Sequence, residues 1–198
     1  MYPYLETIRI EQGRPCNLSY HQDRLNRTFS WVYGESSPFQ LDKLIKFPNE
    51  LSVDKIKLRF LYNKTSFRYE TMIYKPKNIK ILKIVEDNTI EYSYKKTKRR
   101  SIDRLLTSKG DCDDILIVKN GFITDSSIAN IVFFDGKDWL TPDTPLLKGT
   151  CRARLLDEGK IREASIRMEH IPFFHSFCLI NAMNDDLDNP ISIENIKL

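Results

Sequence analysis

The chain lacks the residue patterns of several common protein classes. Its cysteines are few and widely spaced: Cys16, Cys112, Cys151 and Cys178. No two of them form a CxxC pair, so we expect neither a structural zinc site nor a disulfide framework. His170 and His175 have no ligand spacing with a cysteine or a carboxylate pair. We therefore predict no metal site.

Long apolar runs are also missing, so no membrane span is expected. The first residues, Met1-Tyr-Pro-Tyr-Leu-Glu, lack the basic and apolar blocks of a signal peptide. No glycine-rich nucleotide loop or nucleophile elbow is present. The formal net charge of +4 permits anionic ligands but does not require nucleic acid. We expect a cytoplasmic protein that binds neither membrane nor nucleic acid.

The remaining pattern indicates an α+β fold without internal repeats. Apolar runs typical of strands lie at Leu5–Ile10, Ile56–Tyr62, Ser66–Lys75 and Ile79–Val85. Helices are predicted at Tyr20–Tyr33 after Ser19, at Ile102–Ser108 after Ser101, and at Thr150–Gly159. Strands and helices alternate more evenly after residue 86. We therefore expect a small α+β domain at 1–86 and a β-rich domain at 87–198.

Residues 114–134 are the most informative segment. They read as two apolar strands joined at Asn120-Gly121, a pair that favours a tight hairpin turn. The second strand carries an unusual number of polar side chains: Thr124, Asp125, Ser126, Ser127 and Asn130. A buried carboxylate is costly unless it meets a positive or protonated partner. We therefore predict that Asp125 faces such a partner.

Five segments in the same order resemble the fold-type IV pyridoxal-phosphate enzymes, which include branched-chain and D-amino-acid aminotransferases and aminodeoxychorismate lyases. The segments are Glu6-Thr-Ile-Arg with His21-Gln-Asp-Arg-Leu25, Lys95-Lys-Thr-Lys-Arg-Arg-Ser101, the 114–134 hairpin, Pro145-Leu-Leu-Lys-Gly-Thr-Cys-Arg152, and Leu179-Ile-Asn-Ala-Met183. The resemblance implies a two-domain D-amino-acid aminotransferase-like fold with a shortened N-terminal domain. It also implies pyridoxal 5'-phosphate as cofactor and a homodimer.

The resemblance assigns the covalent attachment of the cofactor to a lysine of the basic run. A lysine followed four residues later by arginine and then serine selects Lys96 with Arg100 and Ser101. Lys95 with Arg99 is the competing register. Asp125 stands where the family usually has glutamate, as the partner of the pyridine nitrogen.

The other expected cofactor contacts come from separate segments. Arg24 corresponds to the phosphate-binding arginine. The remaining contacts are expected from Ser126, from Thr150 and Cys151 at a helix start, and from Asn181 and Ala182 at a strand end. Ser126, Ser127 and Asn130 are also candidates to orient Asp125 or to bind the cofactor.

The reaction is left open between two outcomes. Lyases of the family tend to carry threonine at the position of Thr7, which favours cleavage of 4-amino-4-deoxychorismate to 4-aminobenzoate and pyruvate, a step of folate biosynthesis. On this basis Thr7 is expected in the catalytic site with Lys96. The alternative is an aminotransferase of branched-chain or D-amino acids; either way the substrate is small and amino-acid-like.

Two further classes stay open. The first is a non-catalytic relative that retains the cofactor. Aspartate at 125, cysteine at 151 and the trimmed N-terminus agree with it. The second is a nucleic-acid-binding module that uses Tyr92–Arg100, against which the modest net charge argues.

Overall fold

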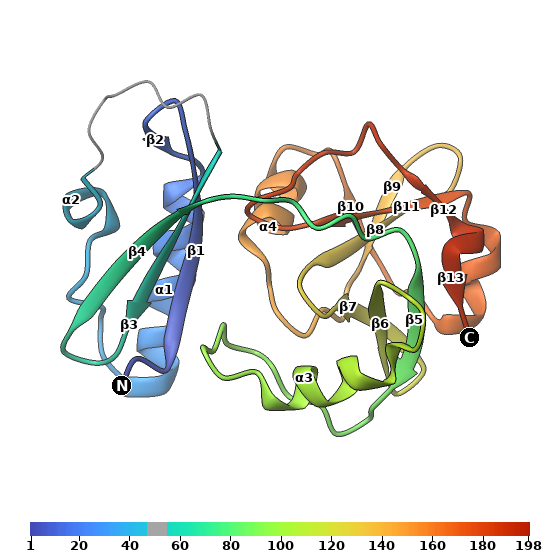
Figure 1. The fold of residues 1–198 in the computed structure, drawn as a ribbon, viewed down its shortest axis with the longest axis horizontal. Helices are drawn as coiled ribbons and strands as arrows, with labels where there is room; N and C mark the ends of the chain where they lie inside the picture. Colours follow the sequence, from blue (N-terminus) through green and yellow to red (C-terminus); the bar gives the residue numbers. More distant parts are fainter. Residues whose placement is uncertain (47–54) are drawn as a thin grey trace. The chain divides into compact units, whose positions relative to one another are not determined.

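The computed structural model describes residues 1–46 and 55–198. Its contacts divide the chain into two compact units (Figure 1). The first unit comprises Met1–Pro76 and Tyr94–Lys98. The second unit comprises Lys77–Ser93 and Arg99–Leu198.

The first unit is an antiparallel sheet in the order β2-β1-β3-β4 with a long helix against it. Its strands are β1 (Tyr4–Glu11), β2 (Arg14–Pro15), β3 (Ile56–Tyr62) and β4 (Phe67–Ile73). Its helices are α1 (Leu18–Tyr33) and the short α2 (Leu41–Leu44).

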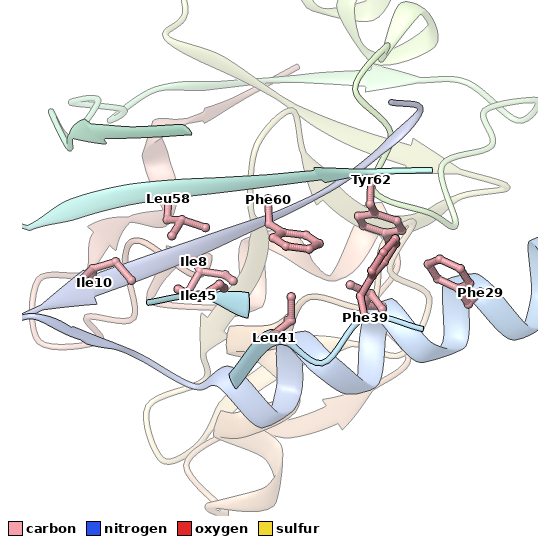
Figure 2. Packing of buried hydrophobic residues seen from close by; sticks show 10 residues of the cluster. Ile8, Ile10, Phe29, Phe39, Leu41, Ile45, Leu58, Phe60 and Tyr62 are labelled. Carbon is pink, nitrogen blue, oxygen red and sulfur yellow. The ribbon is translucent and has the colours of Figure 1, made fainter. Parts of the chain in front are cut away.

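The core of the first unit lies between that sheet and α1. Alternate residues of a strand face the same side, so Ile8 and Ile10 of β1 share a face with Leu58 and Phe60 of β3. Figure 2 shows these side chains packed with Phe29 of α1. Burial of this apolar face holds the helix on the sheet.

The second unit is built on a nine-stranded mixed sheet in the order β10-β9-β8-β7-β6-β5-β13, with β11 paired to β8 and β12 to β11. The strands are β5 (Leu82–Glu86), β6 (Asp114–Lys119), β7 (Phe122–Ser126), β8 (Asn130–Phe134), β9 (Trp139–Pro142), β10 (Arg162–Ala164), β11 (Ser176–Ile180), β12 (Ile191–Ser192) and β13 (Ile196–Lys197).

Helices and short 3-10 turns accompany this sheet. They are α3 (Arg100–Leu106), α4 (Thr150–Asp157) and the turns Thr107–Lys109, Met168–Phe173 and Ile193–Asn195. Leu155 of α4 packs with Val132 of β8 and Ile180 of β11 in one buried cluster. The helix that follows the predicted phosphate turn is therefore fixed to the sheet.

Several elements agree with the sequence prediction. The strand predicted at Ile56–Tyr62 has those bounds in the structure. The predicted hairpin is confirmed: Lys119 pairs with Phe122, and Asn120 and Gly121 both have positive φ, at 54° and 78°. Two consecutive positive φ angles are the geometry that makes asparagine-glycine favourable there.

The predicted helix starts were wrong. α1 begins at Leu18 after Asn17, and α3 begins at Arg100, so Ser19 and Ser101 both lie inside helices. The third helix ends at Asp157 rather than at Gly159. Helix ends depend on tertiary contacts as much as on local capping signals, so such shifts are common.

The division into units also differs from the domain boundary expected after residue 86. Lys77–Ser93 clusters with the second unit, whereas Tyr94–Lys98 clusters with the first. The reason is main-chain pairing with the start of β1. The Leu5 N–H donates to Lys95 O at 3.1 Å, and the Thr97 N–H donates to Pro3 O at 2.9 Å. Lys96, expected in the C-terminal domain, therefore belongs to the first unit.

Because Leu58 lies in the core of the first unit, shortening its side chain should destabilise the protein. Leu58→Ala should lower the free energy of unfolding by about 2–5 kcal/mol, because it leaves a cavity between β3 and α1. Thr71→Ala is the matched control, since Thr71 pairs with Leu58 but is exposed on β4. It should change stability by less than about 0.5 kcal/mol in denaturant unfolding. Equal losses for the two variants would contradict this position of the core.

Candidate active site

Asp125 is a buried carboxylate held by neutral hydrogen-bond donors. It lies in β7 and is only 6% exposed. Its Oδ1 accepts a hydrogen bond from Asn130 Nδ2 at 2.7 Å, and its Oδ2 accepts one from the Leu147 N–H at 2.9 Å. Burial raises the pKa of Asp125 to about 7, against the lowering effect of hydrogen bonds from Leu147, Asn130 and Leu146 and of the Arg152 charge. Near neutral pH both protonation states of Asp125 are therefore populated.

Asn130 links Asp125 to the segment before α4. Its Nδ2 donates to Leu147 O at 2.9 Å as well as to Asp125. Its Oδ1 lies against Gly149, where an added Cβ would stand only 2.0 Å away. Gly149 has ordinary extended backbone angles, so space and not conformation requires glycine there.

The start of α4 is buried, and hydrogen bonds from Arg152 hold it in place. Thr150, Cys151 and Arg152 are all buried in its first turn. Arg152 donates to Pro142 O at 2.8 Å and to Glu163 at 2.6 Å, which fixes the helix to the neighbouring strands. The first N–H groups of a helix have no partner within it and attract anions. Cys151 packs in the apolar cluster with Leu155, so its backbone N–H is the group suited to an anion.

The register of the sheet places Asn181 and Ala182 near the end of β7 that carries Asp125. Asp125 of β7 pairs with Asn130 of β8, and Asn130 pairs in turn with Ile180 of β11. Asn181 and Ala182 follow directly in a tight turn. The Asn181 Oδ1 caps this turn by accepting from the Met183 N–H at 2.8 Å and the Asn184 N–H at 3.1 Å.

The two serines after Asp125 shape the chain reversal. Ser126 Oγ accepts from the Ala129 N–H at 3.1 Å and from the Ile128 N–H at 3.3 Å. The main-chain oxygen of Ser127 accepts from Arg99 Nη1 at 2.6 Å. Of the polar residues expected to orient Asp125, Asn130 does so directly, whereas Ser126 acts on its own turn.

The first unit holds a second buried carboxylate, Glu6, which is 0% exposed. Arg24 of α1 binds it through Nε to Oε1 at 3.0 Å and Nη2 to Oε2 at 2.5 Å. His21 Nδ1 lies 2.7 Å from Oε2. Burial alone would raise the pKa of Glu6, but the Arg24 charge and the hydrogen bonds from His21 and Arg24 lower it to about 2.

Sequence reasoning missed Glu6 as an individual residue. The signal was available, because alternation along β1 places Glu6 on the same face as Ile8 and Ile10. A carboxylate on a core face requires a cation, and Arg24 was the residue expected to bind phosphate. The structure places that arginine in a buried ion pair with Glu6.

The two candidate lysines lie beside the start of β1, in the first unit. Lys96 forms a main-chain bridge with Tyr4 and is exposed, whereas Lys95 is half-buried. The Lys95 charge is close enough to His21 to help lower the pKa of that histidine, although burial is the larger cause. Thr7 is half-buried and, by alternation, on the opposite face of β1 from Glu6.

The predicted residues thus form two sets, one in each unit. The first unit holds Thr7, Arg24 and Lys96. The second unit brings Asp125, Ser126, Thr150, Cys151, Asn181 and Ala182 to the same end of neighbouring strands.

Within residues 1–46 and 55–198, no group of three or more histidine, cysteine or carboxylate side chains could hold a metal ion. No helix of the described chain is long and apolar enough to cross a membrane.

The chain is similar to known proteins over most of its length. A family model described as amino-transferase class IV matches residues 104–185. An uncharacterized protein of Haemophilus influenzae is 43% identical over 186 residues, which is 93% of this chain and 99% of that protein.

The chain is also similar to solved structures. A proposed 4-amino-4-deoxychorismate lyase from Haemophilus somnus 129pt is 37% identical, with a TM-score of 0.88 over 93% of this chain and 97% of that one. A hypothetical aminotransferase from Mycobacterium tuberculosis in its PLP-bound form is 14% identical, with a TM-score of 0.75 over 98% of this chain and 81% of that one. The second likeness concerns the fold alone.

The close approach of Asn130 to Gly149 predicts a large effect of one methyl group. Gly149→Ala should destabilise the protein by about 1–3 kcal/mol, because the methyl collides with a buried amide that also bonds Asp125. In a double-mutant cycle by denaturant unfolding, Gly149→Ala should cost clearly less in an Asn130→Ala background. Strictly additive effects would show that the two residues do not meet.

The raised pKa of Asp125 predicts a pH dependence of stability without ligand. The folded protein retains a proton that the unfolded chain releases above its ordinary pKa of 3.8. This contribution to the free energy of unfolding is complete below pH 3.8 and is lost as the pH rises towards 7. The loss is at most about 4 kcal/mol.

Asp125→Asn should remove that part of the slope, measured by denaturant unfolding at several values between pH 4 and 7. The comparison uses the slope and not the absolute stability, because the amide also disturbs the bond to Leu147. An unchanged slope in the variant would mean that Asp125 is ionised in the folded protein at all these values.

Proposed function

Since the chain belongs to the class IV aminotransferase family, we propose that it is a PLP-dependent lyase that converts 4-amino-4-deoxychorismate to 4-aminobenzoate and pyruvate, with Lys96 carrying the cofactor as a Schiff base. The proposal is supported by the overall likeness to the proposed lyase of Haemophilus somnus. The presence of threonine at position 7 agrees with it.

The observation that carries the cofactor assignment is the environment of Asp125. Both its oxygens accept from neutral donors, and no cation pairs with it among the residues that the structure describes. Such an acid suits a basic ring nitrogen, which would share its proton and hold the carboxylate ionised. When bound, pyridoxal phosphate supplies an electron-accepting ring conjugated to the substrate amine.

The chain's own residues would then have separate tasks. Asp125 keeps the ring nitrogen protonated, and Asn130 keeps Asp125 in place. The N–H groups of Thr150 and Cys151 are suited to the phosphate. Lys96 Nζ, once released by the substrate amine, would take the proton from the carbon that bears that amine.

The shorter side chain at position 125 does not argue against this role. Aspartate is one methylene shorter than the glutamate usual in the family, yet both its oxygens are fixed by bonds to Asn130 and Leu147. A carboxylate without rotational freedom loses little entropy when it binds the ring. We therefore assign the contact to Asp125 directly.

An aminotransferase is the second candidate. The observation in its favour is the fold likeness to the PLP-bound hypothetical aminotransferase of Mycobacterium tuberculosis. The two reactions share the first proton transfer and differ in the products. A lyase releases pyruvate and an aromatic amine from one substrate, whereas an aminotransferase needs a keto acid to regain its starting state. The products therefore decide between them.

The lysine assignment predicts one labelled peptide. After addition of pyridoxal phosphate and reduction with borohydride, mass spectrometry of peptides should place the adduct on Lys96. Lys96→Arg should abolish the visible absorbance of the imine and lower lyase turnover by at least about 10²–10⁴-fold, since both the attachment point and the base are removed. Lys95→Arg is the matched control and should retain both.

Each other outcome has a defined meaning. An adduct on Lys95 would mean that Lys95, and not Lys96, carries the cofactor. The proposed reaction would stay the same. Formation of a keto acid from an amino donor without release of 4-aminobenzoate would favour the aminotransferase. No reducible adduct on any lysine would contradict the enzyme assignment and leave a relative that has lost the cofactor.

A further inference from the structure

The Glu6 carboxylate occupies a position that otherwise takes apolar residues. It shares the core-facing side of β1 with Ile8 and Ile10, and it pairs across the sheet with Phe60 of β3. Burial of a charge there is unfavourable unless its partners are placed with very good geometry. A leucine would fill such a site at no electrostatic cost, so the ion pair calls for an explanation beyond stability.

The contact geometry provides one. Glu6 binds the Nε–Nη2 edge of Arg24 with both oxygens, at 3.0 and 2.5 Å. A guanidinium is planar, so two hydrogen bonds to one edge fix the whole plane. His21 Nδ1, at 2.7 Å from Oε2, restrains the carboxylate in turn. The orientation of the Arg24 guanidinium plane is thereby set before any ligand binds.

We propose that Glu6 is a positioning residue, which holds the Arg24 guanidinium in the orientation that binds a phosphate monoester, and that His21 restrains Glu6 for this purpose. The inference rests on the proposed function, in which Arg24 contacts the phosphate of the cofactor. It adds a role for two buried residues that do not touch the ligand.

Electrostatic attraction and positioning of Arg24 predict opposite effects on phosphate binding when the Glu6 charge is removed. The inference can therefore be tested. Glu6 is ionised and cancels the charge of Arg24, while burial lowers the pKa of His21. Removing the negative charge should therefore strengthen phosphate binding if electrostatic attraction were the whole effect. If orientation matters more, removal should weaken it, because Arg24 then has several orientations to lose on binding.

The experiment compares two ligands that differ only in the phosphate. Dissociation constants of pyridoxal 5'-phosphate and of pyridoxal are measured by absorbance for the wild type and for Glu6→Gln, and their ratio isolates the phosphate contribution. We expect the preference for the phosphorylated ligand to fall about tenfold in Glu6→Gln. Affinity for pyridoxal should change little, since the aldehyde and the ring do not contact Arg24.

Matched variants separate positioning from other effects. Glu70→Gln breaks a comparable pair with Arg59 in the same unit, at 2.5 Å but half-exposed, and should leave the ratio unchanged. Arg24→Lys keeps the charge but loses the planar fork, and should lower the ratio as Glu6→Gln does. Glu6→Gln in the Arg24→Lys background should then have no further effect.

A second variant covers the case that Glu6→Gln does not fold. Glu6→Asp keeps the charge but is too short to bind the Nε–Nη2 edge with both oxygens, so it should also lower the ratio. A ratio that stays at the wild-type value or rises in the folded Glu6 variants would overturn the inference. So would an equal loss of affinity for both ligands, which indicates a purely structural role.

The test also distinguishes this inference from the proposed function. If the wild type forms the reducible adduct but does not prefer the phosphorylated ligand, the phosphate role of Arg24 and this inference fail together, and the lyase assignment stands on Lys96. If the preference exists and Glu6→Gln retains it, only the positioning role fails. If no adduct forms with either ligand, the proposed function itself is contradicted.

Discussion

The buried ion pair between Glu6 and Arg24 is the interaction on which the first unit depends. It joins the third residue of β1 to the middle of α1, at the depth of the hydrophobic core. The segment with Lys95 and Lys96 is hydrogen-bonded to the start of the same strand. Loss of one partner would leave an uncompensated charge in the core, which typically costs about 3–5 kcal/mol. β1 thus holds α1 through the Glu6 side chain and the lysine segment through main-chain hydrogen bonds.

The second unit contains a buried carboxylate in the opposite electrostatic state. Glu6 meets an arginine, and its pKa falls to about 2. Asp125 meets an amide and a main-chain N–H, and burial raises its pKa to about 7. Both are buried, so the identity of the partner decides the difference. Glu6 keeps a constant charge and can only organise its neighbours, whereas Asp125 can exchange a proton with a ligand.

Local chemistry explains what the sequence could predict. The Asn120-Gly121 pair favours a tight turn by itself, and the apolar run of β3 predicts a strand from its own residues. The start of α1 at Leu18 and the return of Tyr94–Lys98 to β1 depend on contacts between residues far apart in the chain, so local signals missed them. The same limit applies to the site. Asp125 was noticed because it interrupts an apolar strand, but the contact of Asn130 with Gly149 appears only after folding.

We propose that the Lys96 side chain carries pyridoxal phosphate and that the Asp125 carboxylate binds its ring nitrogen. A crystal structure of the protein after addition of pyridoxal phosphate and reduction with borohydride tests it most directly. We expect a pyridoxyl group covalently bound to Lys96 Nζ, with its ring nitrogen within hydrogen-bond distance of the Asp125 carboxylate. A group bound to another lysine, or a ring nitrogen that meets no carboxylate, would contradict it.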